Sequence, residues 1–263
     1  MLHISNGKKS IKILNLNLLK THNIFKEELL SLEILKNQGF NNVSYLLKTT
    51  GKSYIIRVFK SNESVNISRE FEFKTQKKAH KQKIAPKAIF LNSEFMIYEY
   101  KKGIHKTKLK NSDIKNLAKQ IKKLHKIKTK AKTYDLKSDL LNYKKMLKDK
   151  KSKKIISESL KSLKKLKKFK KELVLTHHDL NPKNIIFNKN KIKIIDWEYA
   201  GINDRFFDLA AVCIEFKLNK KEEELFLSYY LKKIDKNKYS KLKHFKTIYK
   251  NLCDLWFEKL NYL

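Results

Sequence analysis

The sequence predicts an α+β fold with two lobes, in which a small lobe built on an antiparallel sheet precedes a mainly helical lobe. Short apolar runs separated by turn residues fill residues 25–100, as expected for strands and hairpins, whereas residues 1–24 are polar and irregular. Apolar residues recur at helical spacing from residue 112 onward, as expected for amphipathic helices. The length of 263 residues is enough for one large domain or for two lobes.

The small lobe is predicted over about residues 25–100. Residues 25–35 fit either a helix or the entry to a first strand. The apolar runs 45–48 and 53–59 flank the turn Thr49-Thr50-Gly51-Lys52 and therefore predict a β-hairpin. The other predicted elements of this lobe are a helix that opens at residues 67–72 and two strands at residues 88–91 and 95–100.

The second lobe is predicted to be mostly helical. A first helix is expected to be capped by Ser112 or Asp113 and to end at His125, which we interpret as a structural histidine. Residues 129–172 are rich in lysine and predict a helical insert whose lysines face solvent. Further helices are predicted at residues 207–216, 220–232 and 236–263.

The most informative stretch, residues 173–208, reads LVLTHHDLNPKNIIFNKNKIKIIDWEYAGINDRFFD. Two apolar β-runs flank a polar loop, and a hairpin of this length would bring Asn184 back beside Asp196. Phosphoryl transfer needs metal ions on the phosphates, a carboxylate near the attacking hydroxyl and accurate positioning. Asp179 lies on the loop, where it can reach a hydroxyl, and Asn184 and Asp196 offer the hard oxygen ligands that Mg²⁺ prefers. The stretch therefore predicts phosphoryl transfer.

Composition indicates a globular protein, since 41% of the residues are hydrophobic. No apolar run approaches the roughly 20 residues of a membrane span, and the N-terminal residues lack the apolar region of a signal peptide. We therefore expect a cytoplasmic location and no membrane association. The two cysteines, Cys213 and Cys253, lie in apolar helical contexts and are expected to be buried thiols.

The formal net charge is +36, which is compatible with binding to nucleic acid or to another anionic surface. However, the only arginines are Arg57, Arg69 and Arg205, and every other basic residue apart from histidine is lysine. A nucleic-acid site usually concentrates arginine, the better bidentate reader of bases. We therefore attribute the charge to a coding bias and expect no specific nucleic-acid binding. Because nearly every basic residue of this chain is lysine, an arginine indicates a position that needs a guanidinium group.

The pattern H-x-D-x-x-x-x-N, followed by an apolar strand and Asp, resembles the catalytic core of protein-kinase-like enzymes. The variant HHDLNPKN…IIDWEYAG…FDLA is similar to the choline/ethanolamine kinases and aminoglycoside phosphotransferases, and most like bacterial choline kinases. The resemblance implies a two-lobe protein-kinase-like fold, divided into residues 1–103 and 104–263. It also implies ATP and Mg²⁺ as cofactors. His177 would then brace the catalytic loop, whereas His178 replaces the small or amide residue common in relatives.

The resemblance also implies a nucleotide site in the first lobe. Gly39 and Asn42 occupy the marked positions of the phosphate loop. Arg57 lies inside an apolar strand, where a charge needs a partner. In relatives this position grips the phosphates and pairs with a helix carboxylate, which is Glu72 here with Glu70 as the other candidate. Residues 99–101, beginning at Glu99, match the segment that contacts the adenine ring.

An acceptor site for a small alcohol is implied by the same family. A quaternary ammonium is recognised by aromatic rings and carboxylates. The resemblance supplies Tyr199, Glu215 and Trp256 as candidates, with Asp179 orienting the hydroxyl and accepting its proton. The first of two tryptophans in relatives aligns with Cys253, so one wall of the cage is missing.

The predicted reaction is transfer of the ATP γ-phosphate to choline. The alternative is a related kinase for ethanolamine, thiamine, an aminoglycoside or a sugar. A remote alternative is a non-catalytic basic protein that binds nucleic acid. Near the motif, Asp208 is expected either to cap its helix or to hold the catalytic loop, and Arg205 is expected to pair with Asp204 or Asp208.

Overall fold

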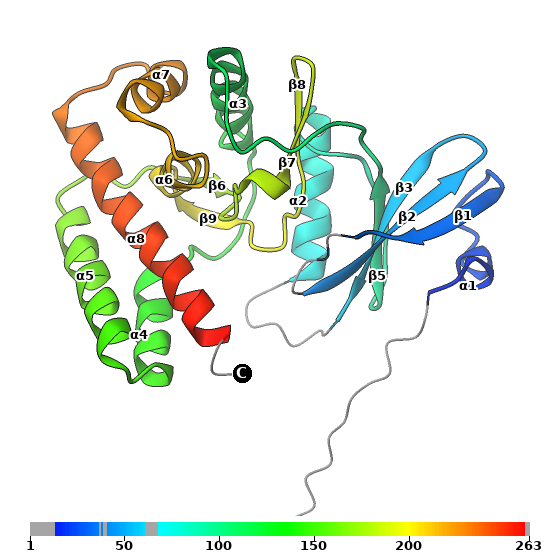
Figure 1. The fold of residues 1–263 in the computed structure, drawn as a ribbon, viewed down its shortest axis with the longest axis horizontal. Coiled ribbons are helices and arrows are strands. Elements are labelled where there is room, and N and C mark those ends of the chain that lie inside the picture. Colours follow the sequence, from blue (N-terminus) through cyan, green and yellow to red (C-terminus); the bar gives the residue numbers. More distant parts are fainter. Residues whose placement is uncertain (1–13, 37, 39–40, 61–67, 261–263) are drawn as a thin grey trace, which may run out of the picture. The chain divides into compact units, whose positions relative to one another are not determined.

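The computed structural model describes residues 14–36, 38, 41–60 and 68–260 of the chain. The chain divides into two compact units, Met1–Ile67 with Lys87–Tyr100 and Ser68–Pro86 with Lys101–Leu263 (Figure 1). The first unit holds an antiparallel sheet and the second holds most of the helices, which confirms the α+β fold class. The lobe boundary after residue 103 stays a prediction.

The described part of the first unit is a five-stranded antiparallel sheet with the strand order β1-β2-β3-β5-β4 (Figure 1). Its elements are α1 (Leu16–Thr21), β1 (Leu29–Ile34), β2 (Asn42–Thr49), β3 (Ser53–Phe59), β4 (Ala88–Leu91) and β5 (Phe95–Glu99). The segment 25–35, which fitted either a helix or a strand, therefore contributes the edge strand β1.

The predicted hairpin of the first unit is confirmed as β2 and β3, which pair Lys48 with Ser53 next to the turn. The Thr49 hydroxyl oxygen closes this turn by accepting a hydrogen bond from the backbone N–H of Lys52 at 3.0 Å. Leu47 and Ile56 are fully buried, and Leu19 of α1 is buried in the same apolar core. The hairpin thus forms because its turn is locally satisfied and its apolar faces share one core.

The second unit is mainly helical, with two short strand pairs at its centre (Figure 1). Its helices are α2 (Arg69–Lys81), α3 (Asn111–Leu124), α4 (Leu136–Met146), α5 (Lys150–Leu166), α6 (Phe206–Glu215), α7 (Lys220–Tyr230) and α8 (Lys236–Leu260). Strand β6 (Leu173–Thr176) pairs with β9 (Gly201–Asp204), and β7 (Ile185–Asn188) pairs with β8 (Lys191–Ile194). The helices predicted from apolar periodicity are confirmed, with ends that differ from the prediction by at most three residues, and the predicted helical residues 261–263 lie outside the described residues.

Helix α3 begins two or three residues earlier than a cap at Ser112 or Asp113 would place it. Its N-cap is Lys110 rather than Ser112 or Asp113, so that expectation was wrong. Asp113 stabilises the start from inside the first turn, because its Oδ2 accepts a hydrogen bond from the Lys110 backbone N–H at 3.1 Å. The side chain of Lys106 also pairs with Asp113, at 2.8 Å. A carboxylate in the first turn is favourable because the helix dipole is positive there.

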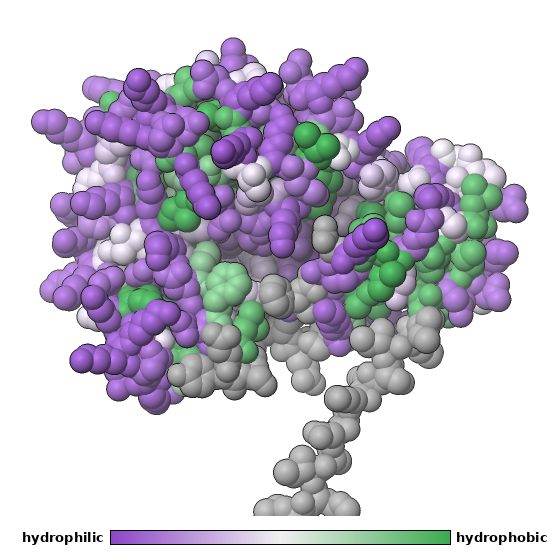
Figure 2. Space-filling model, in the orientation of Figure 1, coloured by the Kyte–Doolittle hydropathy of each residue, from purple (hydrophilic) through white to green (hydrophobic). Residues whose placement is uncertain are grey.

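The lysine-rich insert is confirmed as α4 and α5, of which α5 packs along α8 (Figure 1). Leu140, Ile156 and Leu255 form an apolar cluster shared by these three helices. Asn251 of α8 donates to the hydroxyl oxygen of Ser159 at 3.0 Å, so small residues on α5 let the two helices approach closely. Hydrophilic side chains cover most of the visible face of the molecule (Figure 2), as expected for lysines that face solvent.

The main core of the second unit surrounds the strand pairs and includes fully buried Trp197. Gly103 lies against this region, next to a β-bridge between Ile104 and Phe187. A Cβ atom at Gly103 would lie 2.6 Å from the carbonyl oxygen of Phe187, which is closer than real Cβ atoms approach. Only glycine therefore permits this approach of the chain to β7.

Arg205 does not pair with Asp204 or Asp208, which corrects the expectation from the sequence. Its Nε lies 3.5 Å from the carboxylate of Glu172, just before β6. Asp204 pairs instead with the buried Lys241 of α8 at 2.6 Å. The first pair joins the residues next to the ends of β9 and β6, and the second joins α8 to the end of β9, which are long-range contacts that sequence spacing does not reveal.

Candidate active site

The polar loop between β6 and β7 is organised by Asn181. Its Oδ1 accepts hydrogen bonds from the backbone N–H groups of Lys183 at 2.9 Å and Asn184 at 3.3 Å. These bonds cap the short 3₁₀ turn Pro182–Asn184, and Pro182 at its first position has no N–H to satisfy. The sequence Asn-Pro-Lys-Asn thus builds a rigid turn directly after Asp179.

The carboxylate of Asp179 is held by two amides from this turn. Asn181 Nδ2 donates to Oδ1 at 2.8 Å, and Asn184 Nδ2 donates to Oδ2 at 2.7 Å. Burial raises the pKa of Asp179, the two amides oppose this, and the nearby charge of Glu215 raises it further. Asp179 is therefore a positioned carboxylate whose basicity is above that of an exposed aspartate.

The hairpin β7–β8 brings Asn184 beside Asp196, as predicted. Ile185 is opposite Ile194 in the register, and the backbone N–H of Ile195 donates to the carbonyl oxygen of Asn184 at 3.0 Å. Asp196 follows with a φ of 66°, a left-handed conformation that non-glycine residues seldom adopt. Such strain is often found where a side chain must be aimed at a functional site.

The donor set at the end of this hairpin fits Mg²⁺. Because Asn184 gives its amide N–H₂ to Asp179, its Oδ1 is turned away from that carboxylate. One amide oxygen and one carboxylate from Asp196 are hard ligands, and Mg²⁺ usually completes its shell with phosphate oxygens and water. Among the described residues there is no cluster of three or more His, Cys, Asp or Glu side chains that could hold a metal by itself.

His177 connects the Asp179 loop to the strand that carries Asp196. Its ring faces the carbonyl oxygen of Ile195 with Nε2 at 3.1 Å, and its Nδ1 accepts from the Asp179 backbone N–H at 3.3 Å. Burial lowers the pKa of His177 to about 4, so the ring is neutral at neutral pH. The ring also packs edge-on against Trp197, with 4.8 Å between ring centroids. This geometry is that of a bracing residue.

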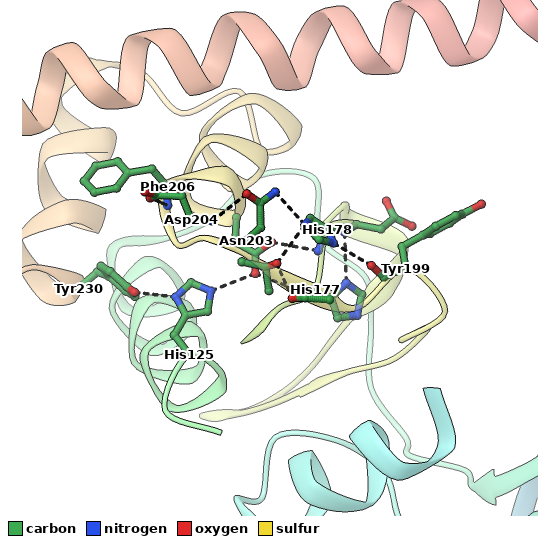
Figure 3. A network of polar contacts seen from close by, with 12 residues as sticks. His125, His177, His178, Tyr199, Asn203, Asp204, Phe206 and Tyr230 are labelled. Carbon is green, nitrogen blue, oxygen red and sulfur yellow. Dashed lines mark hydrogen bonds and ion pairs between the residues drawn. The ribbon is translucent and has the colours of Figure 1, made fainter. Parts of the chain in front are cut away.

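The carboxylate of Asp208 holds the backbone at the start of the loop between β6 and β7. Its Oδ2 accepts from the His177 N–H at 2.8 Å and its Oδ1 from the His178 N–H at 3.0 Å. Oδ2 also contacts His125 Nε2 at 3.0 Å, and the other nitrogen of His125 meets the Tyr230 hydroxyl at 2.6 Å (Figure 3). Of the two roles expected for Asp208, the structure thus has it holding the loop, and His125 is structural as expected.

His178, which replaces the residue type common in relatives, has well-defined partners. Its Nδ1 lies 2.8 Å from the carbonyl oxygen of Tyr199 (Figure 3). Its Nε2 lies 3.0 Å from both Thr176 Oγ1 and Asn203 Nδ2. The side chain therefore links the polar loop between β6 and β7 to the segment that follows Asp196.

Two glutamates meet at Arg69, a contact that the sequence did not reveal. Arg69 Nη1 lies 3.1 Å from Glu72 on α2 and 2.8 Å from Glu198, two residues after Asp196. Glu72 is buried, whereas Glu70 is exposed and pairs with Lys74, so Glu72 is the buried carboxylate of the helix. The sequence contained one signal for this site, the retention of arginine at position 69 in a lysine-rich chain.

The nucleotide candidates lie in the first unit, apart from Glu72 in the second. Arg57 is buried within β3, where it is opposite Ser44 on one side and Met96 on the other. Asn42 is buried at the start of β2, and Glu99 ends β5 with an ion pair to Lys52 at 3.5 Å. Gly39 lies outside the described residues. The pairing of Arg57 with Glu72 and the nucleotide roles of these residues stay predictions.

The acceptor candidates come from three segments of the second unit. Glu215, at the end of α6, accepts a hydrogen bond from the Tyr249 hydroxyl of α8 at 2.9 Å. Cys253 is one turn further along α8, and burial raises its pKa to about 12, with Glu215 and Asp179 close enough to raise it further. The residue Tyr199 is 38% exposed. Glu215, Tyr249 and Cys253 therefore lie together near the carboxylate of Asp179.

Trp256 is half-buried and packs edge-on against Phe257, with 5.1 Å between ring centroids. Its place in the acceptor site stays a prediction. Tyr249 was missed by sequence reasoning, although its spacing of four residues before Cys253 puts both on one face of α8. Both cysteines are free thiols, with Cys213 buried and Cys253 partly buried.

Comparison with known proteins decides the family. Residues 28–253 match the sequence profile of the choline/ethanolamine kinase family. The chain belongs to this family. As a choline/ethanolamine kinase family member, it is an ATP-dependent phosphotransferase that acts on an alcohol.

Related sequences and structures agree with this assignment. A protein LicA homolog of Mycoplasma capricolum is 28% identical over 197 residues, which cover 73% of this chain and 77% of the relative. The crystal structure of choline kinase LicA from Streptococcus pneumoniae has a TM-score of 0.78 at 23% identity, covering 92% and 89% of the two chains. A Plasmodium vivax ethanolamine kinase has a TM-score of 0.69 at 22% identity, covering 93% and 77%. These structures confirm the protein-kinase-like fold.

Within this choline/ethanolamine kinase fold, the second unit brings together most of the predicted catalytic and acceptor residues. Asp179, His177 and Asn184 lie on one loop, and Asp196 is joined to it across the hairpin. Glu215 acts on Asp179 through its charge. No helix of the described residues is long and apolar enough to cross a membrane.

Proposed function

We propose that this family member transfers the γ-phosphoryl group of ATP to the hydroxyl group of choline, giving phosphocholine and ADP. The supporting observation is that Glu215, which accepts a hydrogen bond from the Tyr249 hydroxyl, lies close enough to Asp179 to raise the pKa of that carboxylate. Carboxylates and aromatic faces recognise a quaternary ammonium group. Tyr199 and Trp256 would add further aromatic surface. Because ATP is the donor, we place the reaction in the cytoplasm.

In this proposal Asp179 orients the acceptor hydroxyl and takes its proton as the new oxygen–phosphorus bond forms. A general base works best when its pKa is not far below the working pH, and the raised pKa of Asp179 moves in that direction. The amides of Asn181 and Asn184 fix the direction of the carboxylate. His177, which is neutral and held at both ring nitrogens, braces the loop and exchanges no proton.

Asn184 and Asp196 would bind Mg²⁺, which supplies neutralisation of the charge on the phosphate oxygens. The nucleotide itself would be held in the first unit, with Gly39 and Asn42 on the phosphate loop. Arg57 would grip the phosphates, supported by Glu72, and the segment that begins at Glu99 would contact the adenine ring.

Ethanolamine is the second candidate acceptor because of one observation. Cys253 lies near Glu215 and Asp179, at a position where choline kinases carry a tryptophan. A thiol offers no aromatic face, so the site has less surface for three methyl groups than a full aromatic cage. A primary ammonium, by contrast, gains from direct hydrogen bonds to carboxylates.

The acceptor is tested by measuring ADP release with Mg-ATP and a panel of choline, ethanolamine, thiamine, an aminoglycoside and a sugar. We expect the value of kcat/KM to be highest for choline. A higher kcat/KM for ethanolamine would make ethanolamine the acceptor in place of choline, but would still support phosphoryl transfer to an alcohol. Release that does not depend on any acceptor would contradict the proposed phosphoryl transfer to an alcohol.

Replacing Asp196 by alanine is expected to lower kcat at least about 10²-fold and to raise the Mg²⁺ concentration needed for half-maximal turnover. The physical reason is the loss of the carboxylate that would share the metal with Asn184. Turnover is measured over a series of Mg²⁺ concentrations. Glu224→Gln, which removes an exposed carboxylate on α7, is the matched control. An unchanged Mg²⁺ dependence in Asp196→Ala would rule out this residue as a ligand.

A further inference from the structure

His178 occupies an unusual backbone position for its size. Its φ is 68°, in the left-handed region that glycine and asparagine adopt most easily. A small or amide residue at this position would satisfy the backbone with less strain. The imidazole ring must therefore make contacts that offset the backbone strain. These contacts show which part of the site depends on the ring of His178.

The hydrogen-bond partners fix the tautomer of the ring. Nδ1 faces the carbonyl oxygen of Tyr199, which can only accept, so Nδ1 carries the proton. Asn203 Oδ1 accepts from the Asp204 backbone N–H at 2.7 Å, which turns Asn203 Nδ2 toward His178 Nε2 as a donor. Burial lowers the pKa of His178, which agrees with a neutral ring.

The ring also lies between two aromatic side chains. Its centroid is 4.7 Å from that of Tyr134 and 4.9 Å from that of Phe207. Tyr134 is fixed in turn, since its backbone N–H donates to the Ile202 carbonyl oxygen at 2.8 Å and its hydroxyl donates to Asp139. His178 thus joins the segment around Tyr134 to the turn that carries Tyr199, two segments about 65 residues apart in sequence.

We propose that His178 is a positioning residue for the acceptor: it holds Tyr199 and Tyr134 in the arrangement that binds the substrate's ammonium end. This inference rests on the proposed function, in which Tyr199 contributes to the acceptor site. Burial and the neighbouring Asp139 raise the pKa of Tyr134, and Tyr143 and Tyr199 are close enough to raise it further. This proximity agrees with an aromatic side chain of Tyr134 beside Tyr199. Tyr134 is thereby added to the aromatic residues of the acceptor site.

Acceptor affinity and chemistry should respond differently to a change at His178. The Asp179 carboxylate is held by the amides of Asn181 and Asn184 rather than by the His178 ring. The backbone N–H of His178 binds Asp208 whatever side chain is present. Loss of the ring should therefore weaken binding of the acceptor and leave the catalytic carboxylate in place.

The test compares His178→Gly with His178→Asn, using choline and ethanolamine separately as acceptors. Glycine relieves the left-handed strain but removes every ring contact. Asparagine also tolerates this backbone, and its amide can donate to the Tyr199 carbonyl oxygen. We expect His178→Gly to raise the acceptor KM about tenfold, with kcat and the KM for ATP changed less than about twofold, and His178→Asn to recover most of the loss.

Lys189→Gly is the matched control, because Lys189 is exposed at the β7–β8 turn with a φ of 51°. It should leave all kinetic constants unchanged. An acceptor KM that is unaltered in His178→Gly would overturn the proposal, as would an equal fall of kcat in both variants. If the wild-type protein preferred ethanolamine, the choline assignment would be refuted but the role of His178 would not. The variants are compared with the wild type on each acceptor separately.

Discussion

Replacing Asp179 by alanine is expected to lower kcat by about 10²–10⁴-fold while Mg-ATP still binds. The carboxylate is directed by hydrogen bonds from Asn181 and Asn184 at 2.8 and 2.7 Å, and burial raises its pKa. In the proposed reaction it takes the proton of the attacking hydroxyl, a step that the neighbouring amides cannot perform. The rate is measured as ADP release at saturating choline, and nucleotide binding is measured by calorimetry on the same preparation.

The calorimetric measurement is essential because Asp179 also orients the amide of Asn184, a proposed metal ligand. Retained Mg-ATP affinity together with lost turnover would assign the effect to the chemical step. Glu224→Gln again serves as the control for loss of an exposed carboxylate. Turnover within threefold of wild type in Asp179→Ala would remove Asp179 as the base.

Replacing Asp208 by asparagine is expected to lower the free energy of unfolding by roughly 3–5 kcal/mol. Asp208 is fully buried, and its carboxylate contacts the backbone N–H groups of His177 and His178 and the ring of His125. An amide has one oxygen and cannot accept from all three donors, so at least one buried polar group loses its partner. Urea unfolding measures the change. The same substitution at Asp254, in a largely exposed ion pair with Lys250, should change stability by less than about 0.5 kcal/mol.

The effect of Asp208 should depend on pH in a defined direction. Burial alone would raise the pKa of Asp208, but the hydrogen bond and charge of His125 and the loop N–H groups bring it below its ordinary value. A carboxyl group whose pKa is lower in the folded state stabilises the fold above its unfolded pKa, near 3.9. This contribution is lost as the pH falls through the folded pKa. The stability difference between wild type and Asp208→Asn should therefore narrow below about pH 4, and a difference that grows there would contradict the assignment.

The sequence predicted the parts of the site that depend on neighbouring residues in the chain. The run from Ile185 to Ile194 has two β-patterns with a short turn between them, so local pairing alone brings Asn184 beside Asp196. The cap from Asn181 is also local, since its partners are two and three residues away. Short-range hydrogen bonds of this kind leave a pattern in the sequence.

Contacts between distant segments left no such pattern. Asp208 and His125 are 83 residues apart, and Arg69 and Glu198 are 129 residues apart. Charged residues of both signs occur throughout the chain, so charge alone did not identify these partners. The wrong partner for Arg205 has the same cause, because its carboxylate, Glu172, comes next to it only through the pairing of β6 with β9, in which Leu173 is opposite Asp204. Tyr134 was likewise not identified, since its contact with His178 requires the tertiary fold.

The central claim is tested most directly by identifying the product of the reaction with choline. We would incubate the protein with Mg-ATP and choline and quantify phosphocholine, ADP and inorganic phosphate by ³¹P NMR. The account predicts one phosphocholine for each ADP, with both products absent when Asp179 is replaced by alanine. Formation of ADP with inorganic phosphate and no phosphocholine would contradict it.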